Sequence, residues 1–141
     1  MNNRSELLWR IIEAGHSIED RLEAALAVHG LSMPKFQALR HLVEAGEPLA
    51  LGQLAERIAC VKSNVTQLVD RLENDGLVRR VPDPNDRRSI LATVTNEGLA
   101  RFKAGAQAIQ AAQDELLAVI PSSFESTLDS LMADLRTSTN G

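Results

Sequence analysis

The chain has 141 residues, of which 44% are hydrophobic and 24% charged, and its formal net charge is −4 with a pI near 5.4. This balance is typical of one globular domain with a hydrophobic core and excludes a wholly disordered chain. No apolar run reaches the roughly 18 residues of a membrane span, and charges interrupt the N-terminus too often for a signal peptide, so we expect a cytoplasmic protein. The single cysteine, Cys60, excludes an intrachain disulfide, and 3% aromatic residues argue against a stacking platform for single-stranded nucleic acid.

Two helices are predicted in the first third of the chain. Apolar residues recur at helical spacing from Leu7 to Leu26, and Gly30 ends that pattern. A second helix is predicted from about Ser32 to Ala45, with Pro34 in its first turn, where a missing N–H costs little. The sequence GEP at residues 46–48 then breaks the chain.

The next two predicted helices are short and lie close together in the sequence. Apolar residues stand at i, i+3, i+4 and i+7 in both: Leu51, Leu54, Ala55 and Ile58 in LGQLAERIA, and Val65, Leu68, Val69 and Leu72 in KSNVTQLVDRLENDG. About three residues separate the two runs, and Gly76 ends the second. This arrangement predicts a helix-turn-helix.

The periodicity then changes from helical to extended. LVRRV and SILATV are rich in β-branched residues, and PDPNDRR separates them. Because Pro82 and Pro84 cannot donate to a β ladder, we expect both of them in a loop. The sequence therefore predicts a β-hairpin whose long tip carries Arg87 and Arg88.

Long helices are predicted again at the C-terminal end. Thr95 is a suitable N-cap for a helix of about 25 residues, with Glu97 favourable at its positive end, and Pro121 restarts a last helix. The apolar stripes of the first helix and of these last two are too extensive for one small domain to cover. We therefore predict that they pack against a second copy in a twofold-symmetric homodimer.

These elements define a mainly α (α+β) fold, a winged helix-turn-helix with long N- and C-terminal helices that form a dimerisation region. We predict a single domain over residues 1–141, in which residues 32–95 are the DNA-binding part and residues 1–31 and 96–141 are the dimerisation helices. From Gln53 to Arg101 there are eight basic and seven acidic residues, against seven basic and twelve acidic elsewhere. The middle of the chain is thus the place where a polyanion would bind.

The fourth predicted helix has a polar face suited to DNA. Asn64, Gln67 and Arg71 fall at i, i+3 and i+7, opposite the apolar stripe, and such side chains can form bidentate hydrogen bonds with adenine or guanine in the major groove. Hydroxyl groups and first-turn N–H groups suit phosphate. The alternative is a solvated face, but a position second in a helix-turn-helix and next to a basic hairpin favours DNA recognition. The candidates on this helix are Lys62, Ser63, Asn64, Thr66, Gln67 and Arg71.

A hairpin beside a reading helix would act as a wing. An arginine at its tip can enter the minor groove, where negative potential is strongest when the groove is narrow. Arg87 and Arg88 are the candidates, and we expect Asp86 to form an ion pair with one of them at small energetic cost. For the arginine pair alone, a solvated turn is the alternative.

The segment from Gln53 to Gly98 resembles the winged helix-turn-helix of the MarR family of bacterial transcriptional regulators. The matching motifs are LVDRLENDGLV, then D-x-R at Asp86 and Arg88, then T-x-x-G at Thr95 and Gly98. The resemblance implies a homodimeric repressor on a palindromic operator, with each reading helix in the major groove and each wing in the minor groove. It also implies that Arg88 is the wing-tip arginine.

The resemblance further implies release from DNA by a small, often aromatic or anionic, compound bound between the dimer helices and the reading head. Trp9, His16, Arg40 and His41 are the candidate lining residues, and packing or interface roles are the alternative for each. Many family members carry a basic residue where this chain has Gln67, so base preference does not carry over. Members that sense oxidants usually place their cysteine in the first helix, so Cys60 is better interpreted as a small packed residue.

Other classes of function have less support. The three histidines and one cysteine lack metal-ligand spacing, and we expect neither a metal nor another cofactor. The sequence contains no nucleophile elbow, phosphate loop or zinc-protease motif, which argues against an enzyme. A winged-helix protein-interaction module that no longer binds DNA is the remaining alternative, and Arg71, Arg87 and Arg88 argue against it.

Overall fold

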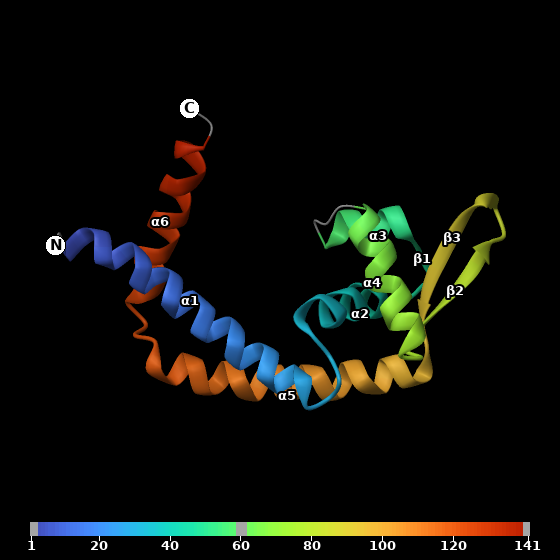
Figure 1. The fold of residues 1–141 in the computed structure, drawn as a ribbon, viewed down its shortest axis with the longest axis horizontal. Coiled ribbons are helices and arrows are strands. Elements are labelled where there is room, and N and C mark those ends of the chain that lie inside the picture. Colours follow the sequence, from blue (N-terminus) through green and yellow to red (C-terminus); the bar gives the residue numbers. More distant parts are fainter. Residues whose placement is uncertain (1–2, 59–61, 140–141) are drawn as a thin grey trace.

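The computed structural model describes residues 3–58 and 62–139. Its helices are α1 (Asn3–Ala27), α2 (Met33–Ala45), α3 (Leu51–Arg57), α4 (Lys62–Asn74), α5 (Asn96–Val119) and α6 (Phe124–Ser138), and its strands are β1 (Leu49–Ala50), β2 (Val78–Asp83) and β3 (Asp86–Val94). The long helix α5 runs along one side of the molecule (Figure 1). Helices α2 to α4 and the strands lie over one end of it, while α6 and the first half of α1 project from the other.

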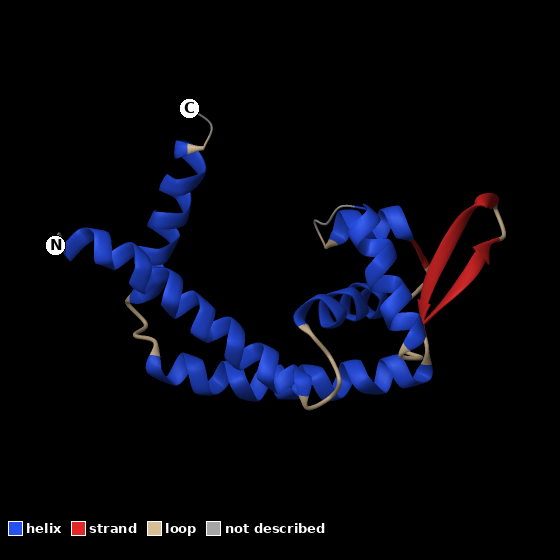
Figure 2. Cartoon of the chain, in the orientation of Figure 1, coloured by secondary structure: helices blue, strands red, loops and turns tan. Residues whose placement is uncertain are grey.

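The mainly helical fold with a small sheet confirms the predicted winged helix-turn-helix (Figure 2). Gly30 and Gly76, at the ends of α1 and α4, have positive φ angles of 68° and 76°, which glycine adopts without strain. Ser32 caps α2, because its hydroxyl oxygen accepts a hydrogen bond from the Lys35 backbone N–H at 3.4 Å.

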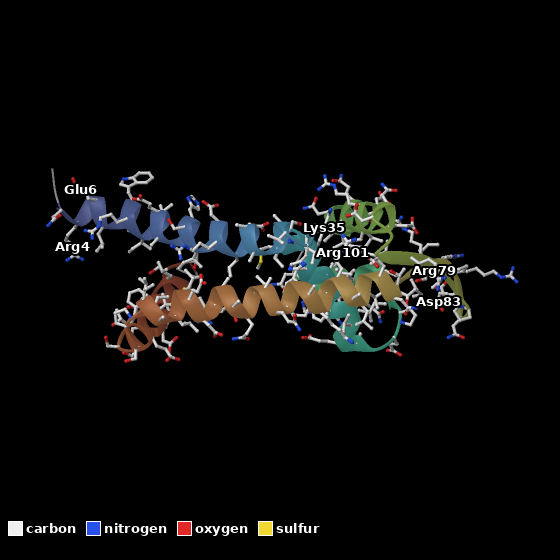
Figure 3. The ribbon with its side chains drawn as sticks, turned by 90° about the horizontal axis from the view of Figure 1, so that it is seen from below. Arg4, Glu6, Lys35, Arg79, Asp83 and Arg101 are labelled. Carbon is white, nitrogen blue, oxygen red and sulfur yellow. The ribbon has the colours of Figure 1, made fainter. Side chains whose placement is uncertain are left out.

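The hydrophobic core lies between the helix-turn-helix, the strands and the adjoining parts of α1 and α5. Leu26 of α1, Leu39 of α2 and Leu54 of α3 are fully buried in it. Helices α1 and α5 lie side by side in both views of the molecule (Figures 1 and 3). Phe36 and Phe102 stack with ring centroids 5.3 Å apart, which joins α2 to α5.

The sheet differs from the sequence prediction in two respects. The strand order is β1-β3-β2, and the two-residue β1 pairs with Leu91 and Ala92 of β3. Pro82 lies inside β2 opposite Ile90, so the long loop predicted for this hairpin is wrong, and residues 84–85 alone form the turn. A proline fits there because β2 is an edge strand, and the register shifts immediately after it.

The start of α5 is fitted closely to the turn between α4 and β2. The Thr95 hydroxyl accepts a hydrogen bond from the Gly98 N–H at 3.0 Å, as predicted for an N-cap, and donates one to the Gly76 carbonyl at 2.7 Å. The Thr95 N–H also donates to the Leu77 carbonyl at 3.0 Å. A Cβ atom added at Gly98 would lie 2.0 Å from that carbonyl oxygen, so only glycine allows this approach.

Large apolar side chains remain exposed at the far end of the molecule. Helix α6 buries none of its residues, and Leu8 and Trp9 of α1 are 64% and 73% exposed. The other exposed apolar residues of these two helices are Leu7, Ile11, Ile12, Ile18, Phe124, Leu128, Leu131, Met132 and Leu135. Among the helices described, none is long and apolar enough to span a membrane.

Candidate nucleic-acid interface

Helix α4 presents three different faces. Val65, Leu68, Val69 and Leu72 form the buried face. Asn64, Gln67 and Arg71 are all exposed and form a second face, called here the reading face. The predicted stripe of polar side chains therefore faces outward. Lys62 starts the helix, but its side chain and that of Ser63 lie outside the described part of the chain, as does Cys60.

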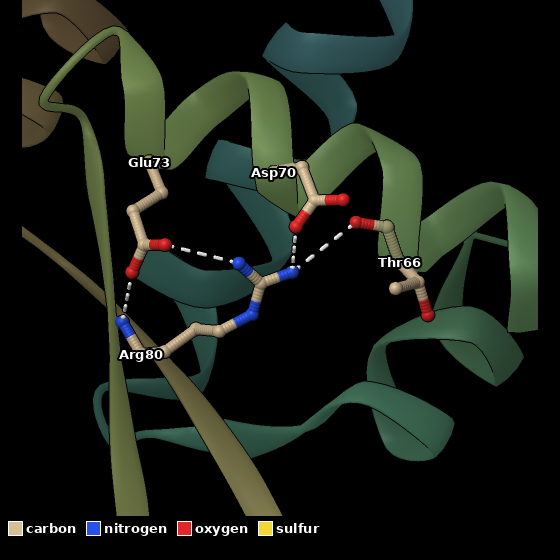
Figure 4. A network of polar contacts seen from close by, with 4 residues as sticks. All are labelled: Thr66, Asp70, Glu73 and Arg80. Atoms are coloured by element: carbon tan, nitrogen blue, oxygen red, sulfur yellow. Dashed lines mark hydrogen bonds and ion pairs between the residues drawn. The ribbon is translucent and has the colours of Figure 1, made fainter.

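The third face of α4 is turned toward β2, where Arg80 binds it (Figure 4). The Arg80 Nη1 donates to the Glu73 Oε1 at 3.0 Å, and Nη2 donates to the Asp70 Oδ1 and to the Thr66 carbonyl at 3.3 Å. The Arg80 backbone N–H donates to the other Glu73 oxygen at 3.0 Å. Burial alone would lower the pKa of Arg80, but the hydrogen bonds and charges of Asp70 and Glu73 outweigh it and raise that pKa.

From the sequence, Arg80 is predicted only to be one of the positive charges in the middle of the chain. Two signals could have revealed its role: strand alternation turns Arg80 to the opposite face from Arg79, and Asp70 and Glu73 lie at i and i+3 on one side of α4. The sequence does not show that this face of β2 packs against this side of α4, which is what brings Arg80 into contact with Asp70 and Glu73.

This network changes the electrostatics of the helix. Asp70 and Glu73 are the only acidic residues of α4, and both form ion pairs with Arg80. Arg71, on the reading face, has no ion-pair partner within 4.0 Å among the described side chains. The reading face therefore carries an unpaired positive charge and no carboxylate.

The β2–β3 hairpin, the wing, carries Arg87 and Arg88, which are both exposed. The ion pair predicted for Asp86 with either arginine is not formed among the residues described. Instead the Asp86 Oδ1 accepts a hydrogen bond from the Arg88 backbone N–H at 3.0 Å. A carboxylate makes this local bond without ordering a long arginine side chain, which an exposed ion pair would require. Both guanidinium groups therefore remain available.

A cleft of about 540 Å³ lies between the wing and the start of α3. Gln53 lines it from α3, and Asp86, Arg88 and Ser89 line it from the wing. Arg88 therefore lies next to the helix-turn-helix. Figure 3 shows the neighbouring wing residues Arg79 and Asp83 at the end of the molecule opposite Arg4 and Glu6 of α1.

Comparison with known proteins identifies the family. The model of the MarR family matches residues 31–90. The HTH-type transcriptional regulator MhqR of Bacillus subtilis is 30% identical over 100 residues, which cover 70% of this chain and 68% of that protein. The chain belongs to the MarR family. A second B. subtilis regulator, YkoM, is 39% identical over 83 residues, 59% of this chain and half of its own length.

Solved structures of MarR-family fold match nearly the whole chain. The organohalide-sensing regulator RdhR-CbdbA1625, with 2,4-dichlorophenol bound, is 25% identical with a TM-score of 0.83, covering 99% of this chain and 83% of that one. A mutant MarR from Escherichia coli complexed with operator DNA is 23% identical with a TM-score of 0.77, covering 96% and 99%. The relatives are transcriptional regulators, which confirms the interpretation that this MarR-family chain is not an enzyme.

The four residues predicted to line an effector pocket lie in two separate places in this chain. Arg40 and His41 line a depression of about 300 Å³ with Gln37, Arg57 and Ile58. Trp9 and His16 are exposed on the part of α1 that extends away from α2 (Figure 1). Within residues 3–58 and 62–139, no group of three or more His, Cys, Asp or Glu residues is placed to hold a metal ion.

Proposed function

We propose that this protein is a sequence-specific double-stranded DNA-binding repressor that acts as a homodimer on a palindromic operator. The observation that carries the proposal is a reading face without carboxylates beside a wing whose Arg87 and Arg88 form no ion pair with any described residue. The fold shared with an E. coli MarR complexed with operator DNA supports it.

Each part of the surface has its own role in the proposal. Asn64 and Gln67 read adenine edges in the major groove, and Arg71 contacts guanine or phosphate. Lys62, Ser63 and Thr66, in the first turns of α4, contact the phosphate backbone and set the register. Arg87 and Arg88 bind in the adjoining minor groove.

The homodimer is supported by the apolar side chains exposed on α1 and α6. Many large apolar side chains exposed together on a protein surface mark an interaction site. A second copy has the same surface and covers it through a twofold axis. That axis places two reading helices one DNA turn apart, and the operator is then a palindrome.

Release by a small aromatic or anionic effector is part of the proposal. The structural likeness to a regulator that holds 2,4-dichlorophenol supports it. The depression beside Arg40 and His41 is the part of the predicted pocket that one chain supplies, and it contains two cationic side chains, Arg40 and Arg57.

The proposal is tested by fluorescence anisotropy with DNA from immediately upstream of the protein's own gene, at several salt concentrations and against scrambled competitor. We expect specific binding that saturates at one dimer per site and weakens steeply with salt. Addition of a panel of chlorinated phenols to the bound complex tests release.

The anisotropy experiment also tests the alternative of an interaction module. If the affinity is weak and equal for the upstream and the scrambled DNA, the next step is a selection of bound fragments from the whole genome. A selection that yields no preferred sequence would contradict the repressor and favour the interaction module.

Replacing Arg88 with alanine should weaken operator binding by about 1–3 kcal/mol, because the wing loses a minor-groove contact. The measurement is the same anisotropy titration at fixed salt. Lys103→Ala is the control, because it also removes one exposed positive charge but lies on α5, away from the wing. Equal affinity of Arg88→Ala and wild type would remove this arginine from the mechanism.

A further inference from the structure

We propose that Arg80 is a positioning residue of the DNA-binding unit, which fixes the wing against α4 and forms ion pairs with both carboxylates of that helix without contacting DNA itself. The inference rests on the proposed function. It separates Arg80 from the other arginines of the wing, although all of them stand in one basic segment of the sequence.

The geometry of the network shows why Arg80 acts on the protein. Its guanidinium group donates to Asp70, Glu73 and the Thr66 carbonyl, which lie along successive turns of α4 (Figure 4). Its side chain is 24% exposed, whereas Arg79, the preceding residue in β2, is exposed. The donors that could bind phosphate are therefore directed at the helix.

An arginine suits this position better than a lysine. The planar guanidinium has donors on two terminal nitrogens, so it can serve three acceptors on one helix face at once. A lysine ammonium is a point charge and cannot span the same set of acceptors from one strand position. Hydrogen bonds between charged partners are also shorter and about twice as strong as neutral ones.

The backbone of β2 takes part in the same network. Because β2 is an edge strand, the Arg80 N–H has no second strand to bind, and the Glu73 carboxylate accepts it at 3.0 Å. One carboxylate thus holds both the main chain and the side chain of Arg80. The wing is therefore tied to α4 at its base, while its tip extends freely.

The network also affects the charge that DNA meets. Without Arg80, Asp70 and Glu73 would place two uncompensated negative charges on a helix that approaches phosphates. Like charges at such an interface oppose binding. Arg80 cancels one of the two charges and draws both carboxylates toward β2, away from the reading face.

The first experiment needs no DNA. Hydrogen–deuterium exchange of residues 78–94 is measured in the full chain for wild type, Arg80→Gln and Arg79→Gln. We expect exchange in Arg80→Gln to be about tenfold faster, because the base of the wing opens more often, and exchange in Arg79→Gln to be unchanged. Equal exchange in Arg80→Gln and wild type would overturn the positioning role. Because DNA is absent, this result does not depend on the proposed function.

The second experiment is a mutant cycle of operator affinity that joins Arg80→Gln with the pair Asp70→Asn and Glu73→Gln. Arg80→Gln alone should weaken binding at least about tenfold, and adding the neutral pair should recover several-fold of that loss. In the chain that keeps Arg80, the neutral pair should not raise operator affinity, because it removes the acceptors that hold Arg80. A direct phosphate contact by Arg80 predicts the opposite: the neutral pair raises affinity by one factor in both backgrounds.

Arg80→Lys provides a milder variant if the glutamine variant does not fold. It keeps the positive charge but loses the two terminal nitrogens of the guanidinium, so its exchange rate should lie between those of wild type and Arg80→Gln. A lysine variant with wild-type exchange would show that charge alone holds the wing and would overturn the argument from geometry.

Discussion

Alanine in place of Gly98 should lower the free energy of unfolding by about 3 kcal/mol or more. The added Cβ would lie 2.0 Å from the Leu77 carbonyl oxygen and 2.8 Å from a methyl carbon of Val94. The nearest obstacle is backbone, so relief requires the start of α5 to move away from the turn between α4 and β2. That movement would also stretch the hydrogen bonds of Thr95 to Gly76 and Leu77.

Denaturant unfolding followed by circular dichroism measures this change, at one fixed chain concentration because dimer stability depends on concentration. Gly52→Ala is the matched control. It lies in α3 and its added Cβ would meet nothing within 4 Å. That variant should be neutral or more stable by about 0.5–1 kcal/mol, because alanine favours helix. A Gly98→Ala variant as stable as wild type would contradict the close fit at this joint.

Replacing Leu128 and Leu131 together with glutamate should dissociate the proposed homodimer and weaken operator binding about 100-fold or more. Both side chains are exposed on the apolar face of α6, at 43% and 39%. A dimer would have to bury four new carboxylates across its axis, which is costly without cations to pair with them. Each chain would then bind a half-site alone.

Light scattering after size-exclusion chromatography measures the mass, which should fall toward the 15.4 kDa of one chain. Ser130→Glu is the control, because Ser130 lies on the opposite side of α6 and is already exposed. Its mass and operator affinity should match those of wild type. A folded dimer of unchanged mass in the Leu128 and Leu131 variant would place the interface elsewhere.

The helical part of the fold followed from local patterns. Apolar spacing, Pro34 in a first turn, the cap at Thr95 and the stop at Gly76 predicted helices close to their observed bounds. These signals lie within one turn of the chain, so the sequence carries them directly. The motifs D-x-R and T-x-x-G, which follow LVDRLENDGLV in the sequence, indicated the family, and comparison with known proteins confirmed it.

The strands were predicted less well, because their pairing is not local. Pro82 was placed in a loop, since its compatibility with a strand depends on β2 being at the sheet edge. The strand β1 has only two residues and no periodicity, so its existence depends on β3 lying beside it. In the same way, Asp86 accepts a hydrogen bond from the Arg88 backbone N–H instead of pairing with an arginine side chain.

The sequence by itself determined the helices, the winged helix-turn-helix order and the reading face of α4, because each depends on periodicity or on a cap within one element. Only the tertiary structure decided which arginines of the wing are free and which is engaged. Arg79 and Arg80 are adjacent and chemically identical, yet strand alternation sends one to solvent and the other to carboxylates that lie seven and ten residues earlier. Their roles differ because packing β2 against α4 brings distant charges together, and no local pattern encodes that distance.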